Sequence, residues 1–222
     1  MRNRHKFFIL ASLLYLLPAV AMADGLVHGT VTIDDKTVTA EYIIMGSEAY
    51  LGSGNNACIP QYSVGNVVVP AAITYNNQEY PVTKVSNMAF RLCTKITEVH
   101  LPANVTRVGD FAFQGCRALL KVELPSALTS IGTGAFIDLP YLYKIDCHAT
   151  TPPTWEYNDV FKSHTGGIGD SQIYSYGIML CVPESSQEAY STALYSNSNL
   201  GWNTPDGWGH FEHIYQTFDE NA

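Results

Sequence analysis

The stretch VGDFAFQGC at residues 108–116 has a counterpart on each side, VSNMAFRLC at 85–93 and IGTGAFIDL at 131–139. All three begin with Val or Ile, contain an Ala-Phe pair and end in Cys or Leu, and they recur with a period of 23 residues. A fixed period of this length predicts a repeat architecture, in which one unit buries its apolar side only against its neighbours.

The whole units align without a gap as VTKVSNMAFRLCTKITEVHLPAN from Val82, VTRVGDFAFQGCRALLKVELPSA from Val105 and LTSIGTGAFIDLPYLYKIDCHAT from Leu128. Eight apolar positions coincide in each unit, and we expect them to form the core. The structure is therefore expected to place three side chains on top of one another in consecutive coils, namely Phe90, Phe113 and Phe136.

Each unit also predicts its own local structure. The alternation of Leu119, Val122 and Leu124 before Pro125 is typical of a short strand, and stacked units would form a parallel sheet. Residues 108–110 are expected to turn the coil, and 111–113 to form a short helical turn.

The pattern LxxVxLPxxVTxIGxxAFxxCxxL resembles the BspA-like subfamily of bacterial leucine-rich repeats, which is typical of exported and surface proteins of Bacteroidetes. The resemblance is specific in residues 82–150 and extends back to a strand and Pro at 67–70, with residues 73–81 inserted and 75–80 read as a hairpin. It implies a curved solenoid used for adhesion or binding, and it implies no catalytic residues.

Both ends of such a solenoid need to be closed. Residues 24–66 are interpreted as an N-terminal β cap, in which strands at 30–33 and 38–45 form a hairpin. Residues 151–222 are interpreted as a C-terminal α+β cap, with a strand at 178–182, a helix capped by Ser185 and running to about Tyr195, and an anchor around Trp208. The predicted fold class is thus a leucine-rich-repeat solenoid, mainly β with short helical turns, with repeats at 67–150 between two caps.

The first 23 residues have the pattern of an export signal. Basic residues precede an apolar run at 7–17, Pro18 interrupts that run, and Ala21-Met22-Ala23 is a small-residue cleavage pattern. We expect cleavage after Ala23 rather than a membrane span, and a location in the periplasm, at the cell surface or outside the cell.

Composition excludes one class of partner. Without the signal, 9 Lys and Arg remain against 20 Asp and Glu. Nucleic acid is therefore not an expected partner, because phosphate binding needs a basic face.

The five cysteines are an odd number with no Cys-x-x-Cys pair. Cys93 and Cys116 share the repeat position of Leu139, which predicts buried, structural thiols. For Cys147 and Cys181 a disulfide and two unbridged core thiols are both compatible with the sequence.

Outward positions on successive strands should line up roughly 4.8 Å apart. This predicts two columns of candidate partner-binding residues, Glu98/Lys121/Lys144 and His100/Glu123/Asp146. We interpret the second column as a solvated ladder in which His100 offsets carboxylate repulsion, with a divalent cation site as the alternative. A polar insertion at 196–207 adds Trp202 as a further candidate.

Catalytic patterns are weak. His210-Phe211-Glu212-His213 lacks the helical spacing of a zinc protease, and no Gly-x-Ser-x-Gly elbow occurs. We predict an exported, non-enzymatic binding or adhesion module without a cofactor, which contacts a protein or glycan at the cell surface. The alternatives are a metal-dependent hydrolase on the cap and a structural subunit of a surface assembly.

Overall fold

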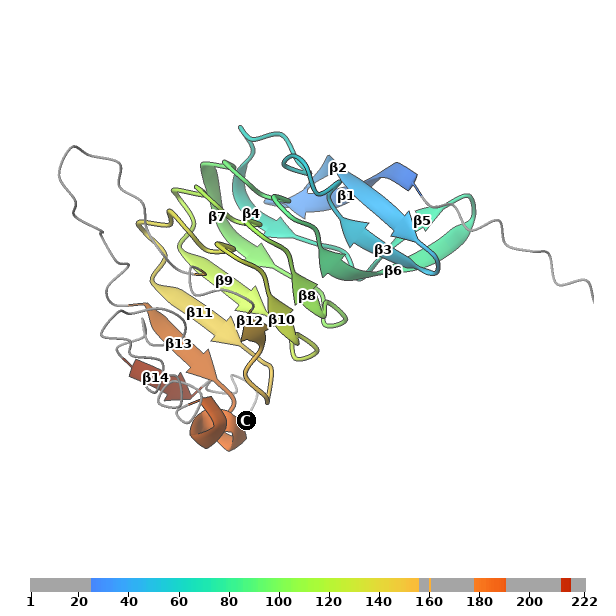
Figure 1. The fold of residues 1–222 in the computed structure, drawn as a ribbon. Coiled ribbons are helices and arrows are strands. Elements are labelled where there is room, and N and C mark those ends of the chain that lie inside the picture. The colour runs from blue at the N-terminus through green and yellow to red at the C-terminus, as the bar shows by residue number, and fades with distance from the viewer. Residues whose placement is uncertain (1–24, 156–159, 161–177, 191–212, 217–222) are drawn as a thin grey trace, which may run out of the picture.

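The computed structural model describes residues 25–155, 160, 178–190 and 213–216. These residues form a mostly-β structure in which successive coils of the chain stack along one curved axis (Figure 1). The predicted signal segment, the end of the predicted helix, the polar insertion with Trp202 and the Trp208 anchor lie outside the described residues.

One side of the stack, here called the first wall, is a row of parallel strands. The strands of the three repeats are in the register that the 23-residue period predicts, with Val122 opposite Val99 on one side and Ile145 on the other. In spatial order the strands are β4 (Val64–Val68), β7 (Lys95–His100), β9 (Lys121–Leu124), β11 (Lys144–Cys147), β13 (Met179–Val182) and β14 (His213–Gln216).

The opposite side, the second wall, is a further row of parallel strands. In spatial order these are β3 (Glu48–Leu51), β6 (Gln78–Val85), β8 (Arg107–Val108), β10 (Ser130–Ile131) and β12 (Thr154–Trp155). A threonine at the same repeat position links the coils, since Thr106 and Thr129 donate their hydroxyls to the carbonyls of Thr83 and Thr106 at 3.2 and 3.0 Å.

The predicted hairpin at 75–80 is confirmed. Strand β5 (Ala72–Tyr75) pairs with β6 in antiparallel fashion, and the two-residue turn consists of Asn76 and Asn77 with φ of 50° and 60°. Asparagine tolerates this left-handed conformation better than most residues, which fits it to the primed turns of tight hairpins.

An N-terminal hairpin joins the two walls into one sheet. Strand β1 (Gly25–Ile33) pairs with β2 (Lys36–Met45) through a turn at Asp34-Asp35, so the hairpin predicted at 30–33 and 38–45 is present with longer strands. Because β1 also pairs with β4 and β2 pairs with β3, the hairpin spans the first end of the stack (Figure 1). Strand β3 was not predicted from the sequence.

The core lies between the walls, and its centre is a stack of phenylalanine rings. The ring centroids of Phe90 and Phe113 are 5.1 Å apart, those of Phe113 and Phe136 are 5.2 Å apart, and both pairs are within 8° of parallel. All three side chains are buried. The expectation that equivalent residues lie on one another in consecutive coils is confirmed.

The short helical turn predicted at 111–113 is a single hydrogen-bonded turn and not a helix: the Gln114 amide donates to the Phe111 carbonyl at 3.1 Å. Phe111 itself has a φ of 54°. The amides of Phe90 and Phe113 instead donate to the carbonyls of Ala112 and Ala135 in the next coil, at 2.7 and 2.8 Å. An amide that donates to the next coil cannot also continue a helix within its own coil, so the stacking limits this segment to single turns.

Beyond β13 the chain forms a short 3₁₀ helix, η1 (Glu184–Ser186), and residues 187–190 continue as an α-helix. The predicted capping role of Ser185 is wrong, because Pro183 occupies the N-cap without a side-chain hydrogen bond and Ser185 lies inside the helix. No helix in the described part of the chain is long and apolar enough to cross a membrane.

Candidate functional site

The outward side chains of β7, β9 and β11 form the predicted columns. Glu98, Lys121 and Lys144 are neighbours in register on the three strands. His100, Glu123 and Asp146 are likewise neighbours two residues further along. The stacking of the coils thus brings six candidate residues together on the first wall.

Asp146 connects the two columns through two ion pairs. Its carboxylate oxygens lie 2.8 Å from Lys121 Nζ and 3.0 Å from Lys144 Nζ, and its side chain is only 10% exposed. Burial raises the pKa of the Asp146 carboxyl, but the hydrogen bonds from both lysines lower it more, so the pKa lies below its ordinary value of 3.8. The hydrogen bond with Asp146 raises the pKa of Lys121. Asp146 therefore holds the two ammonium groups in place.

We predict that Asp146→Asn lowers the free energy of unfolding by about 2 kcal/mol at pH 7, because it removes two charge-assisted hydrogen bonds. Since the folded-state pKa is below that of the unfolded chain, the carboxylate stabilises the fold above about pH 4 and this contribution is lost as the pH falls through the folded value. Urea unfolding at pH 7 and pH 3 measures both effects. Asp35→Asn, in the exposed turn of the N-terminal hairpin, is the control, and an Asp146→Asn deficit of equal size at both pH values contradicts the prediction.

Glu123 lies between two histidines. His100 Nδ1 is 2.7 Å from Glu123 Oε2, and His148 Nε2 is 2.9 Å from Glu123 Oε1. The other ring nitrogen of His100, Nε2, is 3.5 Å from Glu98. The interpretation that His100 offsets carboxylate charge is consistent with this geometry. The part played by His148 was missed, although it continues the outward alternation of Lys144 and Asp146.

We predict that the pKa of Glu123 is measurably below its ordinary value of 4.5, and that it rises in His100→Ala. Burial raises this pKa, but the hydrogen bonds with His100 and His148 outweigh burial and lower it. Carbon-13 NMR of the carboxyl group during a pH titration gives the value directly. His28→Ala, at an exposed position of β1, should leave it unchanged, and an unaltered Glu123 titration in His100→Ala would refute the assignment.

The alternative of a cation site in the His100/Glu123/Asp146 column finds no support in these contacts. Both oxygens of Asp146 face lysines, and Glu123 accepts from His148 rather than converging with Asp146. Within the residues that the structure describes, no group of three His, Cys, Asp or Glu is arranged to hold a metal ion.

The five cysteines are buried and unbridged. Cys93 and Cys116 are fully buried, as predicted, and burial raises the pKa of Cys93 to about 12. The sequence left a disulfide and two free thiols open for Cys147 and Cys181, and the structure shows them unbridged. Cys147 Sγ lies 3.1 Å from Tyr190 Oη inside the core. Cys181 lies opposite Asp146, the residue next to Cys147 in its strand. Neighbouring positions of a strand face opposite sides of the sheet, so the two sulfurs do not meet.

The second wall carries a column that was not predicted. Tyr50, Lys84, Arg107 and Ser130 are neighbours in register on β3, β6, β8 and β10. Lys84 Nζ donates to Tyr50 Oη at 2.8 Å and lies 4.3 Å from the centre of the Tyr50 ring. A signal was present in the sequence, because Lys84 and Arg107 occupy the same repeat position.

Of the remaining candidates, Trp202 and residues 210–212 lie outside the described residues. His213 is in β14, where only the backbone is described.

Comparison with known families matches residues 71–159 to the model of the BspA-type leucine-rich repeat region, in six copies. The stacked coils and the mostly-β sheet agree with this match. Residues 71–159 are a BspA-type leucine-rich repeat region. The match overlaps the predicted repeats at 67–150, while the division of the rest of the chain into caps stays a prediction.

One solved structure to which this chain is similar is a leucine-rich cell surface protein from Faecalibacterium prausnitzii A2-165. It is 21% identical, with a TM-score of 0.43, and the alignment covers 66% of this chain and 41% of that one. This chain thus corresponds to less than half of that protein's length. A search of curated proteins gives no significant match.

Proposed function

We propose that the protein is an exported, non-enzymatic binding module, built as a solenoid with an N-terminal β cap and a C-terminal α+β cap. It contacts a protein or glycan at the cell surface through the first wall. The observation that carries the proposal is the row of charged and imidazole side chains on three consecutive strands, held in fixed positions by ion pairs between coils.

Partial exposure supports a contact role for these side chains. Glu98, His100 and Glu123 are 33 to 36% exposed, and Lys121 and Lys144 are 25 and 30% exposed. Because the stack fixes these groups before any ligand arrives, little conformational entropy is lost on binding. Trp202 remains a proposed aromatic contact.

The export part of the proposal rests on the signal pattern at residues 1–23. Mass spectrometry of the protein recovered from culture medium and envelope fractions of its host should give a chain that begins at Asp24. Recovery of the intact chain with Met1 from the cytoplasm would refute export.

Binding is tested with residues 24–222 on arrays of extracellular proteins and glycans. We expect Glu98→Ala combined with His100→Ala to weaken binding of the best array member at least about tenfold, the effect of losing about 1.4 kcal/mol. Ser130→Ala, on the second wall, is the matched control. Equal binding by both variants would remove the first wall from the proposal.

A further inference from the structure

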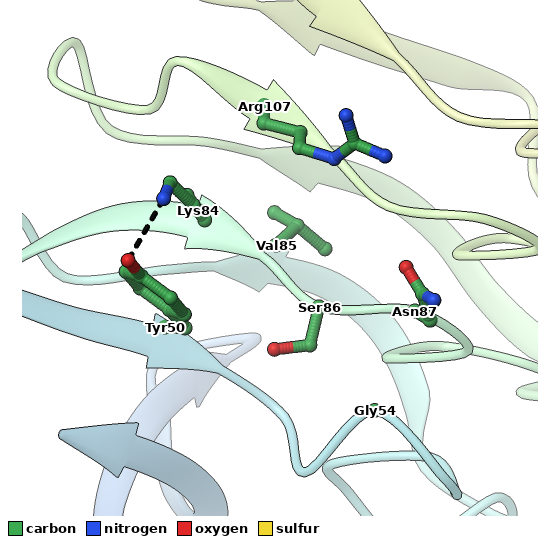
Figure 2. Close-up of a pocket in the computed structure, with 7 residues that line it drawn as sticks. All are labelled: Tyr50, Gly54, Lys84, Val85, Ser86, Asn87 and Arg107. Atoms are coloured by element: carbon green, nitrogen blue, oxygen red, sulfur yellow. Dashed lines mark hydrogen bonds between the residues drawn. The ribbon is translucent and has the colours of Figure 1, made fainter. Parts of the chain in front are cut away.

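A pocket of about 340 Å³ lies on the second wall, away from the proposed contact face (Figure 2). The residues that line it include Tyr50, Lys84, Ser86, Asn87 and Arg107, from β3, β6, β8 and the turn after β6. Small-molecule sites usually have volumes of about 300 to 1,000 Å³, so this pocket fits one small ligand or one residue of a polymer.

The pocket carries positive charge without ion-paired carboxylates. Among the described residues, neither Lys84 nor Arg107 forms a salt bridge, although the chain has 20 acidic side chains against 12 basic ones. Lys84 is fixed by Tyr50, and the guanidinium of Arg107 has no hydrogen-bond partner in the described part of the chain. Arginine binds a carboxylate through two parallel hydrogen bonds, so a free guanidinium in a pocket favours that group.

Two acidic side chains of the adjoining coils, Glu48 and Asp110, are already engaged. Glu48 accepts a hydrogen bond from Thr83 Oγ1 at 2.8 Å. Asp110 accepts from the Thr133 amide at 2.9 Å and from Asn87 Nδ2 at 3.3 Å. Both carboxylates are therefore bonded to uncharged groups of the stack. An incoming anion does not have to compete with either of them for Lys84 or Arg107.

The uncharged groups that line the pocket can still form hydrogen bonds with the hydroxyl groups of a ligand. Tyr50 Oη accepts from Lys84 and keeps its own proton to donate. Ser86 Oγ donates to the Gly52 carbonyl at 2.8 Å and keeps its lone pairs, and Asn87 has a second amide proton. In Figure 2, Tyr50 and Lys84 lie at one end, Arg107 and Asn87 at the other, and Ser86 between them.

We propose that this pocket binds a sugar residue that bears a carboxylate, as a uronic acid does. The carboxylate pairs with Arg107, the ammonium of Lys84 adds positive potential, and the sugar hydroxyls bond to Tyr50, Ser86 and Asn87. This site goes beyond the function proposed above, because it lies on the other wall and uses none of the same residues.

The test is a titration of ¹⁵N-labelled residues 24–222 with galacturonic acid, galactose and N-acetylglycine, followed by NMR. Galacturonic acid should shift the amides of residues 85–87, whereas neutral galactose should not. Arg107→Gln should weaken the binding at least about tenfold, and Lys84→Gln should weaken it less. Lys36→Gln, at the exposed start of β2, should have no effect.

Three results would overturn the proposal. Equal binding of galactose would show that the carboxylate is not recognised. Equal binding of N-acetylglycine would assign the pocket to peptide carboxylates instead of acidic sugars. Unchanged affinity in both Arg107→Gln and Lys84→Gln, with native amide spectra, would exclude the basic pair. None of these results depends on whether the first wall binds a partner.

Discussion

Phe113→Ala is expected to lower the free energy of unfolding by about 3 to 5 kcal/mol. The Phe113 ring lies between those of Phe90 and Phe136, with centroids 5.1 and 5.2 Å away, and its side chain is fully buried. Its removal loses apolar burial and leaves a cavity that neither neighbour can fill, because each is held by its own coil. Equilibrium urea unfolding followed by circular dichroism gives the difference.

The control for this substitution is Leu120→Ala in the same repeat. Leu120 is 38% exposed, so its truncation should cost clearly less than that of Phe113. A loss below about 1 kcal/mol for Phe113→Ala would mean that the ring stack contributes little to stability.

Gly109→Ala is expected to cost about 3 kcal/mol, although it adds one methyl group. A Cβ at Gly109 would lie 2.5 Å from the backbone nitrogen of Asn87 and 2.6 Å from the carbonyl carbon of Ser86. Both atoms belong to the backbone of the preceding coil, so the contact is relieved only if the two coils separate. Thermal unfolding of the variant and of the wild-type chain measures the effect.

The same position in the first repeat is Ser86, and this difference has a structural cause. The preceding strand there is β3, and Ser86 donates its hydroxyl to the Gly52 carbonyl instead of meeting a repeat turn. Gly25→Ala, where nothing lies within 4 Å of the added Cβ, is the control. A Gly109→Ala variant as stable as Gly25→Ala would show that the coils are not in such close contact.

The sequence predicted the parts of this fold that follow from repetition. Residues 23 positions apart have the same role, so the register of β7, β9 and β11 and the ring stack follow from alignment of the units. The two hairpins followed from turn chemistry at Asp34-Asp35 and Asn76-Asn77. The helical turn predicted at 111–113 is limited to one hydrogen bond, because a local pattern does not reveal that the Phe113 amide bonds to the next coil.

The two columns of outward residues on the first wall were predicted from the sequence, but the ion pairs among them were not. The alignment places Lys121 beside Lys144, which suggests that their two positive charges repel each other. In the structure both side chains point toward Asp146 and form ion pairs with it. The alignment also does not indicate the contact of His148 with Glu123 in the preceding coil. Long side chains can reach diagonal neighbours on adjacent strands, and which neighbour each one contacts depends on its rotamer and on local burial.

By itself, the sequence determined that the chain forms stacked coils with a period of 23 residues, because only such stacking buries one apolar side of each unit. The tertiary structure decided how the stack begins and what its surfaces offer: the N-terminal hairpin ties both walls into one sheet, and Lys84 and Arg107 line one pocket with Tyr50. The physical reason is that periodicity fixes which residues share a position, whereas contacts between side chains also depend on the path of the unrepeated segments around them.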